Sequence, residues 1–88
     1  MDETVELLGL LPLRSEINVN FGRVLKSLRL AANLSQEELA HRSNLHRTYV
    51  SQLERGLKSP SLKAVTALAE ALDLKAYALV KAAEEKKY

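Results

Sequence analysis

The stretch SQEELAHRSNLHRTYVSQLERG, residues 35–56, constrains the fold of this chain more than any other part of the sequence. Glu38 follows Ser35 by three residues, which is the spacing of a capping box, so we expect a helix to begin here. Ala40 is small enough for a second helix to cross close by. Asn44 stands where this helix should end, and asparagine tolerates the left-handed conformation of a sharp turn.

A second helix is expected from about residue 46 to residue 55. Val50 and Leu53 are three residues apart and turn towards the core, while Leu45 fills the corner between the helices. Gly56 ends the second helix as the residue after its C-cap. Two short helices that cross steeply over a turn of this length form a helix-turn-helix, whose second helix enters the major groove of DNA.

The amino-acid sequence of this region and of the residues after it resembles that of the phage Cro/repressor-like helix-turn-helix family. The matching segments are LSQEELA, RTYVSQLERG and KSPSL–x–x–V–x–x–LAEAL–x–L, and the resemblance covers residues 21–74. Asn44 departs from the family, which usually has glycine there. Within the family, NLHRTYVSQLERG is most similar to the small controller proteins of restriction–modification systems. The resemblance also implies a partly buried salt bridge between Arg29 and Glu54.

Three more helices complete the expected fold, an all-α, compact five-helix domain of the phage-repressor DNA-binding type over residues 20–88. Asn18 or Asn20 caps the first helix, which ends near Ala32. Its core stripe is Phe21, Val24, Leu25, Leu28 and Ala32. Ser61 caps the fourth helix, whose core stripe is Leu62, Val65, Leu68, Ala69 and Leu72. The last helix, from about residue 75 to residue 86, presents Tyr77, Leu79, Val80 and Ala83, which can cover the core or form a dimer seam.

Residues 1–19 are expected to form an N-terminal arm, with a short helical turn over residues 3–8. Gly9 and Pro12 argue against one long helix there. Two interpretations stay open for the exposed leucines of this arm. They belong to a disordered tail, or they cover the core or a partner subunit, because exposed leucines favour aggregation. These residues are Leu7, Leu8, Leu10 and Leu11.

Charge is unevenly distributed along the chain, although its net value is only +2. Residues 20–63 carry eight basic and three acidic side chains, whereas residues 1–19 have a net charge of −3. The basic excess lies on the helix-turn-helix region, as a surface that faces phosphates requires. The chain has no cysteine, and its apolar run LLGLLPL is too short for a membrane span and follows an acidic start. We therefore expect a cytoplasmic protein.

The face of the second helix that points away from Val50 and Leu53 should meet DNA. Arginine can bind guanine through two hydrogen bonds, glutamine can do the same for adenine, and threonine offers a methyl group to thymine. The expected base-contacting residues are Arg47, Thr48, Ser51 and Gln52. For Arg47 a contact with phosphate alone stays an alternative.

Phosphate contacts are expected around this helix. Gln36 begins the first helix of the motif, where a side-chain amide and backbone N–H groups can bind phosphate together. The complete expected set is Gln36, His46, Arg55, Lys58 and Ser59. Arg23 and Lys26 lie off the core stripe and are expected to face solvent or phosphate, and Tyr49 is expected mainly to pack.

These observations predict a sequence-specific, DNA-binding transcriptional regulator. It would bind a palindromic operator on double-stranded DNA as a homodimer, with recognition helices about 34 Å apart. No metal site, cofactor, small-molecule effector or catalytic group is evident, so we do not expect an enzyme. Two other functions stay open. An antitoxin of this fold would bind both DNA and a protein toxin, and a protein-interaction adaptor would have lost DNA binding, which the polar, basic recognition helix argues against.

Overall fold

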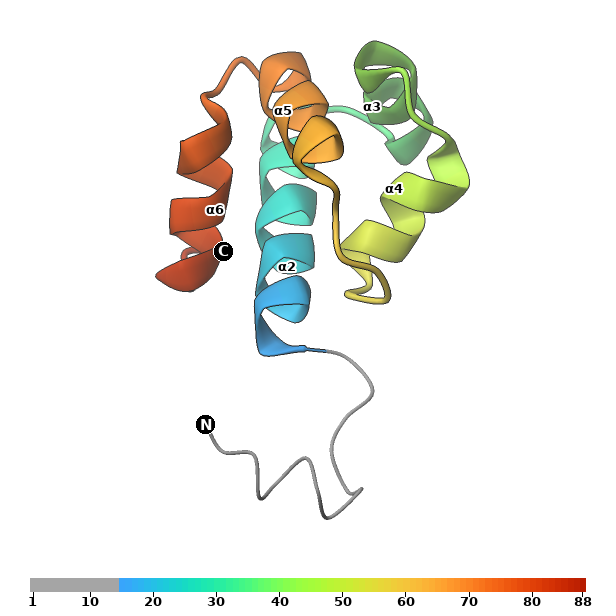
Figure 1. Cartoon of the computed structure of the whole chain (residues 1–88). Coiled ribbons are helices and arrows are strands. Elements are labelled where there is room, and N and C mark those ends of the chain that lie inside the picture. Colours follow the sequence, from blue (N-terminus) through green and yellow to red (C-terminus); the bar gives the residue numbers. More distant parts are fainter. Residues whose placement is uncertain (1–14) are drawn as a thin grey trace.

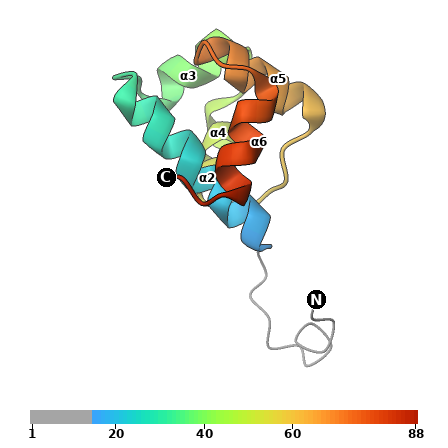
Figure 2. The ribbon, with the colours of Figure 1, turned by 90° about the vertical axis from the view of Figure 1, so that its left-hand side faces the viewer.

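Helix α2, Glu16–Ala31, runs through the middle of the described structure, residues 15–88 of a computed structural model (Figure 1). Helix α6, Ala76–Glu84, packs on one side of α2, and α4, Arg47–Glu54, packs on another. Helix α3, Gln36–Ser43, contacts α4 and α5, Leu62–Ala71, and α5 also packs on α6 (Figure 2). Residues 15–88 hold these five helices and no strand, which confirms the expected all-α fold.

Serine side chains cap the starts of α3 and α5, as the sequence predicted. The Ser35 hydroxyl oxygen accepts from the Glu38 amide at 3.0 Å, and the Glu38 carboxylate accepts from the Ser35 amide at 2.8 Å. The capping box is therefore complete. Ser61 caps α5 by accepting from the amide of Ala64 at 3.0 Å. These caps satisfy amides that the first turn of a helix leaves without partners.

The start of α2 differs from the sequence prediction. Its N-cap is Ser15, whose hydroxyl oxygen accepts from the amide of Asn18 at 3.1 Å, and not Asn18 or Asn20. Residues 16–19, which we assigned to the N-terminal arm, therefore belong to the first helix. Asn20 cannot cap because its side chain is buried within the helix and its Oδ1 accepts from the hydroxyl of Tyr88.

Four helix ends share one pattern, a left-handed residue followed by leucine. The left-handed residues are Asn33, Asn44, Gly56 and Asp73, with φ between 59° and 73°. After α4, for example, the Leu57 amide donates to the carbonyl of Gln52 at 2.9 Å, and the Gly56 amide donates to the carbonyl of Leu53. This is the Schellman arrangement, in which the following apolar residue covers the end of the helix. The predicted roles of Asn44 and Gly56 are confirmed.

The core is built from the inner faces of all five helices. Its most deeply buried large side chains are Leu25, Leu39, Leu53, Leu68, Leu79, Val24 and Val50. Two expected core positions are wrong. Ala32 is exposed at the end of α2, and Leu62 is 85% exposed on the first turn of α5, whereas Leu28 and Leu72 are partly buried and pack against the core. On α6, Leu79 and Ala83 are buried, whereas Tyr77 and Val80 are exposed.

Gly22 marks a close approach between α2 and α4. A Cβ atom at this position would lie 2.3 Å from the carbonyl oxygen of Leu53 and 2.5 Å from that of Glu54. Both are backbone atoms and cannot swing aside as a flexible side chain would. Gly22 therefore allows the C-terminal end of α4 to rest directly on the backbone of α2.

Two predictions lie outside the described residues. They are the short helical turn over residues 3–8 and the docking of the arm leucines at residues 7–11. Within residues 15–88, no helix combines the length and the apolar character that crossing a membrane requires.

Candidate nucleic-acid interface

Helix α4 has one buried and one open face. Val50 and Leu53 are fully buried, and this fixes the rotation of the helix about its axis. The four expected base-contacting side chains lie on the other face. Arg47 and Thr48 are exposed, and Ser51 and Gln52 are half-buried. A helix of this length presents side chains three and four positions apart together, so one face can meet the edges of several base pairs.

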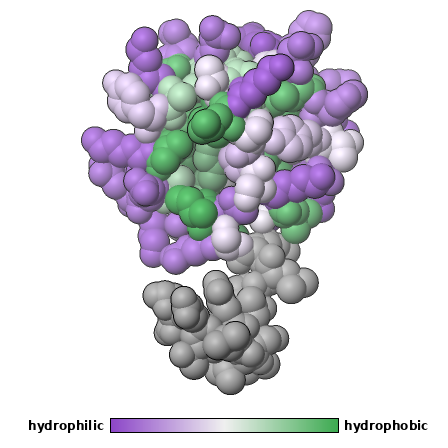
Figure 3. Space-filling view, in the orientation of Figure 1, coloured by the Kyte–Doolittle hydropathy of each residue, from purple (hydrophilic) through white to green (hydrophobic). Residues whose placement is uncertain are grey.

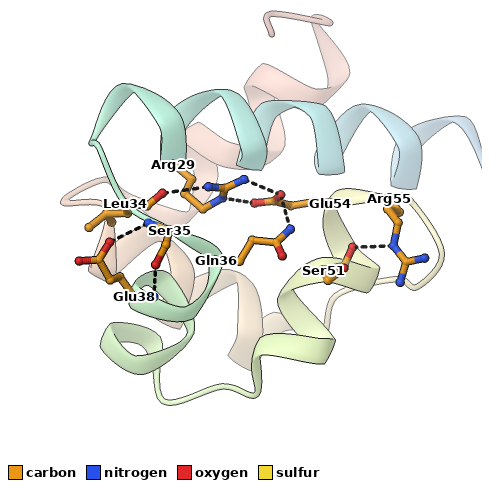
Figure 4. Close-up of polar contacts among 8 residues, drawn as sticks. All are labelled: Arg29, Leu34, Ser35, Gln36, Glu38, Ser51, Glu54 and Arg55. Atoms are coloured by element: carbon orange, nitrogen blue, oxygen red, sulfur yellow. Dashed lines mark hydrogen bonds and ion pairs between the residues drawn. The ribbon is translucent and has the colours of Figure 1, made fainter.

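A shallow hollow lies between the start of α3 and this open face. It is lined by Gln36, Arg47, Thr48, Ser51 and Arg55, so five of the nine expected DNA contacts surround one depression. Gln52 is on the same helix but does not line the hollow. The Arg55 Nε donates to the backbone carbonyl of Ser51 at 3.4 Å, a long contact that leaves the terminal guanidinium nitrogens facing outward (Figure 4).

The remaining expected phosphate contacts flank α4. His46 is the exposed N-cap of the helix and makes no side-chain capping bond, and Lys58 is exposed in the following loop. Ser59 is also exposed, but its hydroxyl oxygen accepts from Nδ2 of Asn18 at 2.7 Å. That bond ties the loop to the first turn of α2. Nearby, the Tyr49 hydroxyl accepts from the amide of Ser61 at 3.4 Å, so Tyr49 also fixes this loop while its ring packs on the core.

A buried ion pair anchors the end of the recognition helix. Arg29 Nε donates to Oε2 of Glu54 at 2.6 Å, and Arg29 Nη2 donates to Oε1 at 3.0 Å (Figure 4). A further guanidinium nitrogen, Nη1, donates to the carbonyl of Leu34 at 2.8 Å. The hydrogen bonds to Glu54 raise the pKa of Arg29 against the opposing effect of its burial. The salt bridge that the resemblance implied is confirmed, and it joins α2 to α4.

Sequence reasoning missed a third partner of this pair. Gln36 Nε2 donates to Oε1 of Glu54 at 2.9 Å, so the expected phosphate-binding side chain reaches inward to the ion pair (Figure 4). No local sequence pattern predicts this bond, because eighteen positions separate the two residues and only the crossing of α3 and α4 brings them together.

A second missed contact involves the end of the chain. Tyr88 lies against α2, where Arg23 Nη1 donates to its hydroxyl at 3.4 Å and the Arg23 guanidinium carbon lies 5.3 Å from the ring centre. Arg23 was expected to face solvent or phosphate. It is exposed but packs on an aromatic ring, a favourable cation–π arrangement.

Residues 25–79 match the Helix-turn-helix family. The chain belongs to this helix-turn-helix family. The control protein C.BamHI of Bacillus amyloliquefaciens is 41% identical over 59 residues, which are 66% of this chain and 73% of that protein. The immunity repressor protein of Bacillus phage phi105 is 37% identical over 59 residues, which are 67% of this chain but 41% of the repressor.

A solved structure resembles this helix-turn-helix chain in three dimensions. The restriction–modification controller protein C.AhdI from Aeromonas hydrophila superposes with a TM-score of 0.69 at 47% identity, covering 70% of this chain and 94% of that one. The relatives of the present chain named above are regulators, and the helix-turn-helix family consists of DNA-binding proteins. The chain is therefore a DNA-binding transcriptional regulator and not an enzyme.

Proposed function

We propose that the chain regulates transcription as a symmetric homodimer on a palindromic operator. The observation that carries this proposal is the open face of α4, whose polar and basic side chains surround one hollow while its other face is locked into the core. A recognition helix must present its side chains in a fixed register, because base edges are read by hydrogen bonds of defined geometry. The buried Arg29–Glu54 pair and the close contact at Gly22 supply that rigidity.

Each contact in the proposed complex has its own task. Arg47 would bind O6 and N7 of a guanine, Gln52 would bind an adenine, and Thr48 and Ser51 would contact neighbouring bases. The flanking side chains would hold phosphates on both sides of the groove and set the register of the helix. They are Gln36, His46, Arg55, Lys58 and Ser59.

Homodimer formation is supported by the apolar surface around the last helix. On α6, Tyr77 is 73% exposed and Val80 is 41% exposed, whereas Leu79 and Ala83 are buried in the core. In Figure 3 apolar residues gather over the part of the molecule where Figure 1 draws α6 beside α2 and α5. A second copy packed against α6 would remove this surface from water. Two recognition helices would then lie about one turn of DNA apart.

The similar proteins indicate which kind of regulator this chain would be. The similarity to C.BamHI and to C.AhdI supports a controller protein of a restriction–modification system, working in the cytoplasm where its operator lies. The antitoxin alternative assigned the toxin contact to the N-terminal arm, which lies outside the described residues. No feature of residues 15–88 favours that alternative.

Selection of binding sites from random DNA duplexes tests the proposal directly. The purified protein would be incubated with the duplex pool at near-physiological salt, and the retained sequences would be read. We expect an enriched palindrome whose half-sites contain guanine and adenine at positions that Arg47 and Gln52 can reach. Retention without sequence enrichment would contradict specific recognition, and an enriched single half-site would contradict the symmetric dimer.

A further inference from the structure

Glu54 is bonded from two sides by residues with different tasks. Its Oε2 accepts from Arg29, while its Oε1 accepts from both Arg29 and Gln36, at 3.0 Å and 2.9 Å. The Glu54 side chain is only 2% exposed. Gln36, by contrast, is half-buried and lines the hollow beside Arg47 and Thr48. The Gln36 side chain therefore extends from the buried ion pair to the surface that faces DNA.

The charge of Glu54 decides how the Gln36 amide is turned. A carboxylate paired with arginine accepts hydrogen bonds and donates none. Only the nitrogen of the Gln36 amide can therefore face it, and the amide cannot flip without placing oxygen against oxygen. One of the two Nε2 hydrogens is used by Glu54, and the other remains for a partner on the open side.

We infer that Glu54 is a positioning residue for DNA binding, because it holds the Gln36 amide so that its second N–H meets a phosphate oxygen. This inference rests on the proposed operator binding. We call the contact chain a relay: Arg29 holds Glu54 in place, and Glu54 holds the Gln36 amide in place. A side chain held in one orientation loses less conformational freedom on binding than a mobile one, so the phosphate contact becomes stronger.

Loss of the Gln36 phosphate contact should affect DNA binding in a way that distinguishes it from loss of the other contacts. Because glutamine is neutral, its phosphate contact releases no counterion through added charge, and its loss should leave the salt dependence of binding unchanged. Because phosphates carry no sequence information, operator and random duplexes should lose affinity equally. Loss of a phosphate-binding lysine such as Lys58 would change the salt dependence of binding. Loss of a base-contacting residue such as Arg47 would weaken operator binding more than binding to random DNA.

A double-mutant cycle on the full chain tests the relay. The variants are Gln36→Ala, Glu54→Gln and both together, measured on the selected duplex at a temperature where circular dichroism shows every variant folded. Glu54→Gln keeps the size of the side chain but can turn an N–H towards Gln36, which would reverse the Gln36 amide. We expect Gln36→Ala to weaken binding about tenfold in the native background and less than about twofold beside Glu54→Gln.

Thr48→Ala is the matched control. Thr48 lines the same hollow, but the side-chain partners of Glu54 within residues 15–88 are Arg29 and Gln36. Its effect should be the same in both backgrounds. Equal effects of Gln36→Ala in both backgrounds would overturn the relay and leave the proposed function standing. If the native protein binds no duplex at all, the proposed function and the relay both fail.

The side-chain amide of Gln36 gives a second measurement that does not depend on Glu54→Gln folding. In ¹⁵N-labelled native protein, we expect the amide proton bonded to Glu54 to be shifted from its position in a free glutamine before DNA is added, and the outward proton to shift when the duplex binds. Gln52 serves as the internal comparison, because its side chain makes no bond to Glu54. Gln36 amide protons that keep the chemical shifts of a free glutamine, with or without DNA, would overturn the relay.

Discussion

At the scale of single residues, the buried charges of Arg29 and Glu54 stand out in so small a core. Their side chains are 8% and 2% exposed, and a buried ion pair contributes little net stability compared with well-packed apolar residues. In this protein the pair fixes how the helices are placed relative to one another. Together with Gln36 and the Leu34 carbonyl, the pair ties α2, α3 and α4 and the start of the motif to one another. An apolar replacement would pack but would not define how these helices cross.

Replacement of Glu54 by alanine should destabilise the protein far more than replacement of Gln36. Glu54→Ala leaves the Arg29 guanidinium buried without its partner, which typically costs about 3–5 kcal/mol. Gln36→Ala removes one hydrogen bond from a half-buried side chain and should cost about 1 kcal/mol. Chemical denaturation of both variants measures the difference. Equal free energies of unfolding would mean that the pair is not held away from water.

Arg47 and Lys58 should differ in the kind of binding they support. Arg47→Ala should cost about 1–3 kcal/mol on the operator and relax base preference at one position in each half-site, because a base contact is lost. Lys58→Ala should weaken operator and random DNA alike and reduce the salt slope by about one, because a phosphate contact is lost. Binding titrations at several salt concentrations separate the two. A sequence-selective effect of Lys58→Ala would contradict its assignment.

The residues on the open face of α4 could be predicted from the sequence because their positions follow from helical periodicity. Val50 and Leu53 define the inner face, and the outer face follows from them. The Gln36–Glu54 bond and the contact of Tyr88 with Arg23 could not be predicted, because each depends on how two helices cross or where the chain end comes to rest. The side-chain partners of a surface residue are set by tertiary packing, which leaves no local pattern.

At the scale of helices, most bounds could be predicted from the sequence, and the start of α2 is the exception. An asparagine or glycine that must adopt a positive φ is visible in the sequence, and the following leucine strengthens the pattern. The start of α2 was ambiguous because Ser15, Asn18 and Asn20 are all good caps. Tertiary contacts decided between them, since Asn18 binds Ser59 and Asn20 is buried beside Tyr88.

Gly22→Ala should destabilise the fold although alanine favours helices. Replacing glycine inside a helix normally gains up to about 1 kcal/mol. Here the new methyl group would lie 2.3 Å from a backbone oxygen of α4, so α2 and α4 must separate. We expect a net loss of about 1–3 kcal/mol and weaker operator binding, since the end of the recognition helix moves. Ser27→Ala, at an exposed site on the same helix, is the control. A stabilised Gly22→Ala protein would refute the close contact.

The capping box of α3 should make part of the stability depend on pH. The Ser35 amide, which donates to the Glu38 carboxylate, holds the pKa of Glu38 below its ordinary range. A lowered folded-state pKa gives stability that is present above the unfolded value, about 4.3, and is lost as the pH falls through the folded value. Thermal melts of native protein and Glu38→Gln should therefore differ more at about pH 7 than at about pH 3. A constant difference would mean that the capping bond does not depend on the charge.

At the scale of the whole molecule, α2 separates two working surfaces. It contacts α4 on one side and α6 on another, so the proposed DNA face and the proposed dimer face belong to different helices on a shared support. Changes on α6 should thus alter self-association without altering the contacts of α4. This independence allows the homodimer to be tested apart from base recognition.

Tyr77→Asp should weaken the dimer and, through it, binding to the palindrome. Tyr77 is 73% exposed on α6, and an aspartate there would carry a charge into the interface when a second copy packs against it. We expect the dimer dissociation constant to rise at least about tenfold, as for an aromatic residue at the centre of an interface. Sedimentation velocity over a concentration series measures it. Leu62→Asp is the control, because Leu62 is an 85% exposed apolar residue on the first turn of α5 and should leave the dimer intact. If Tyr77→Asp stays dimeric while Leu62→Asp dissociates, the second copy binds at the first turn of α5 and not on α6, and the proposed spacing of recognition helices has to be abandoned.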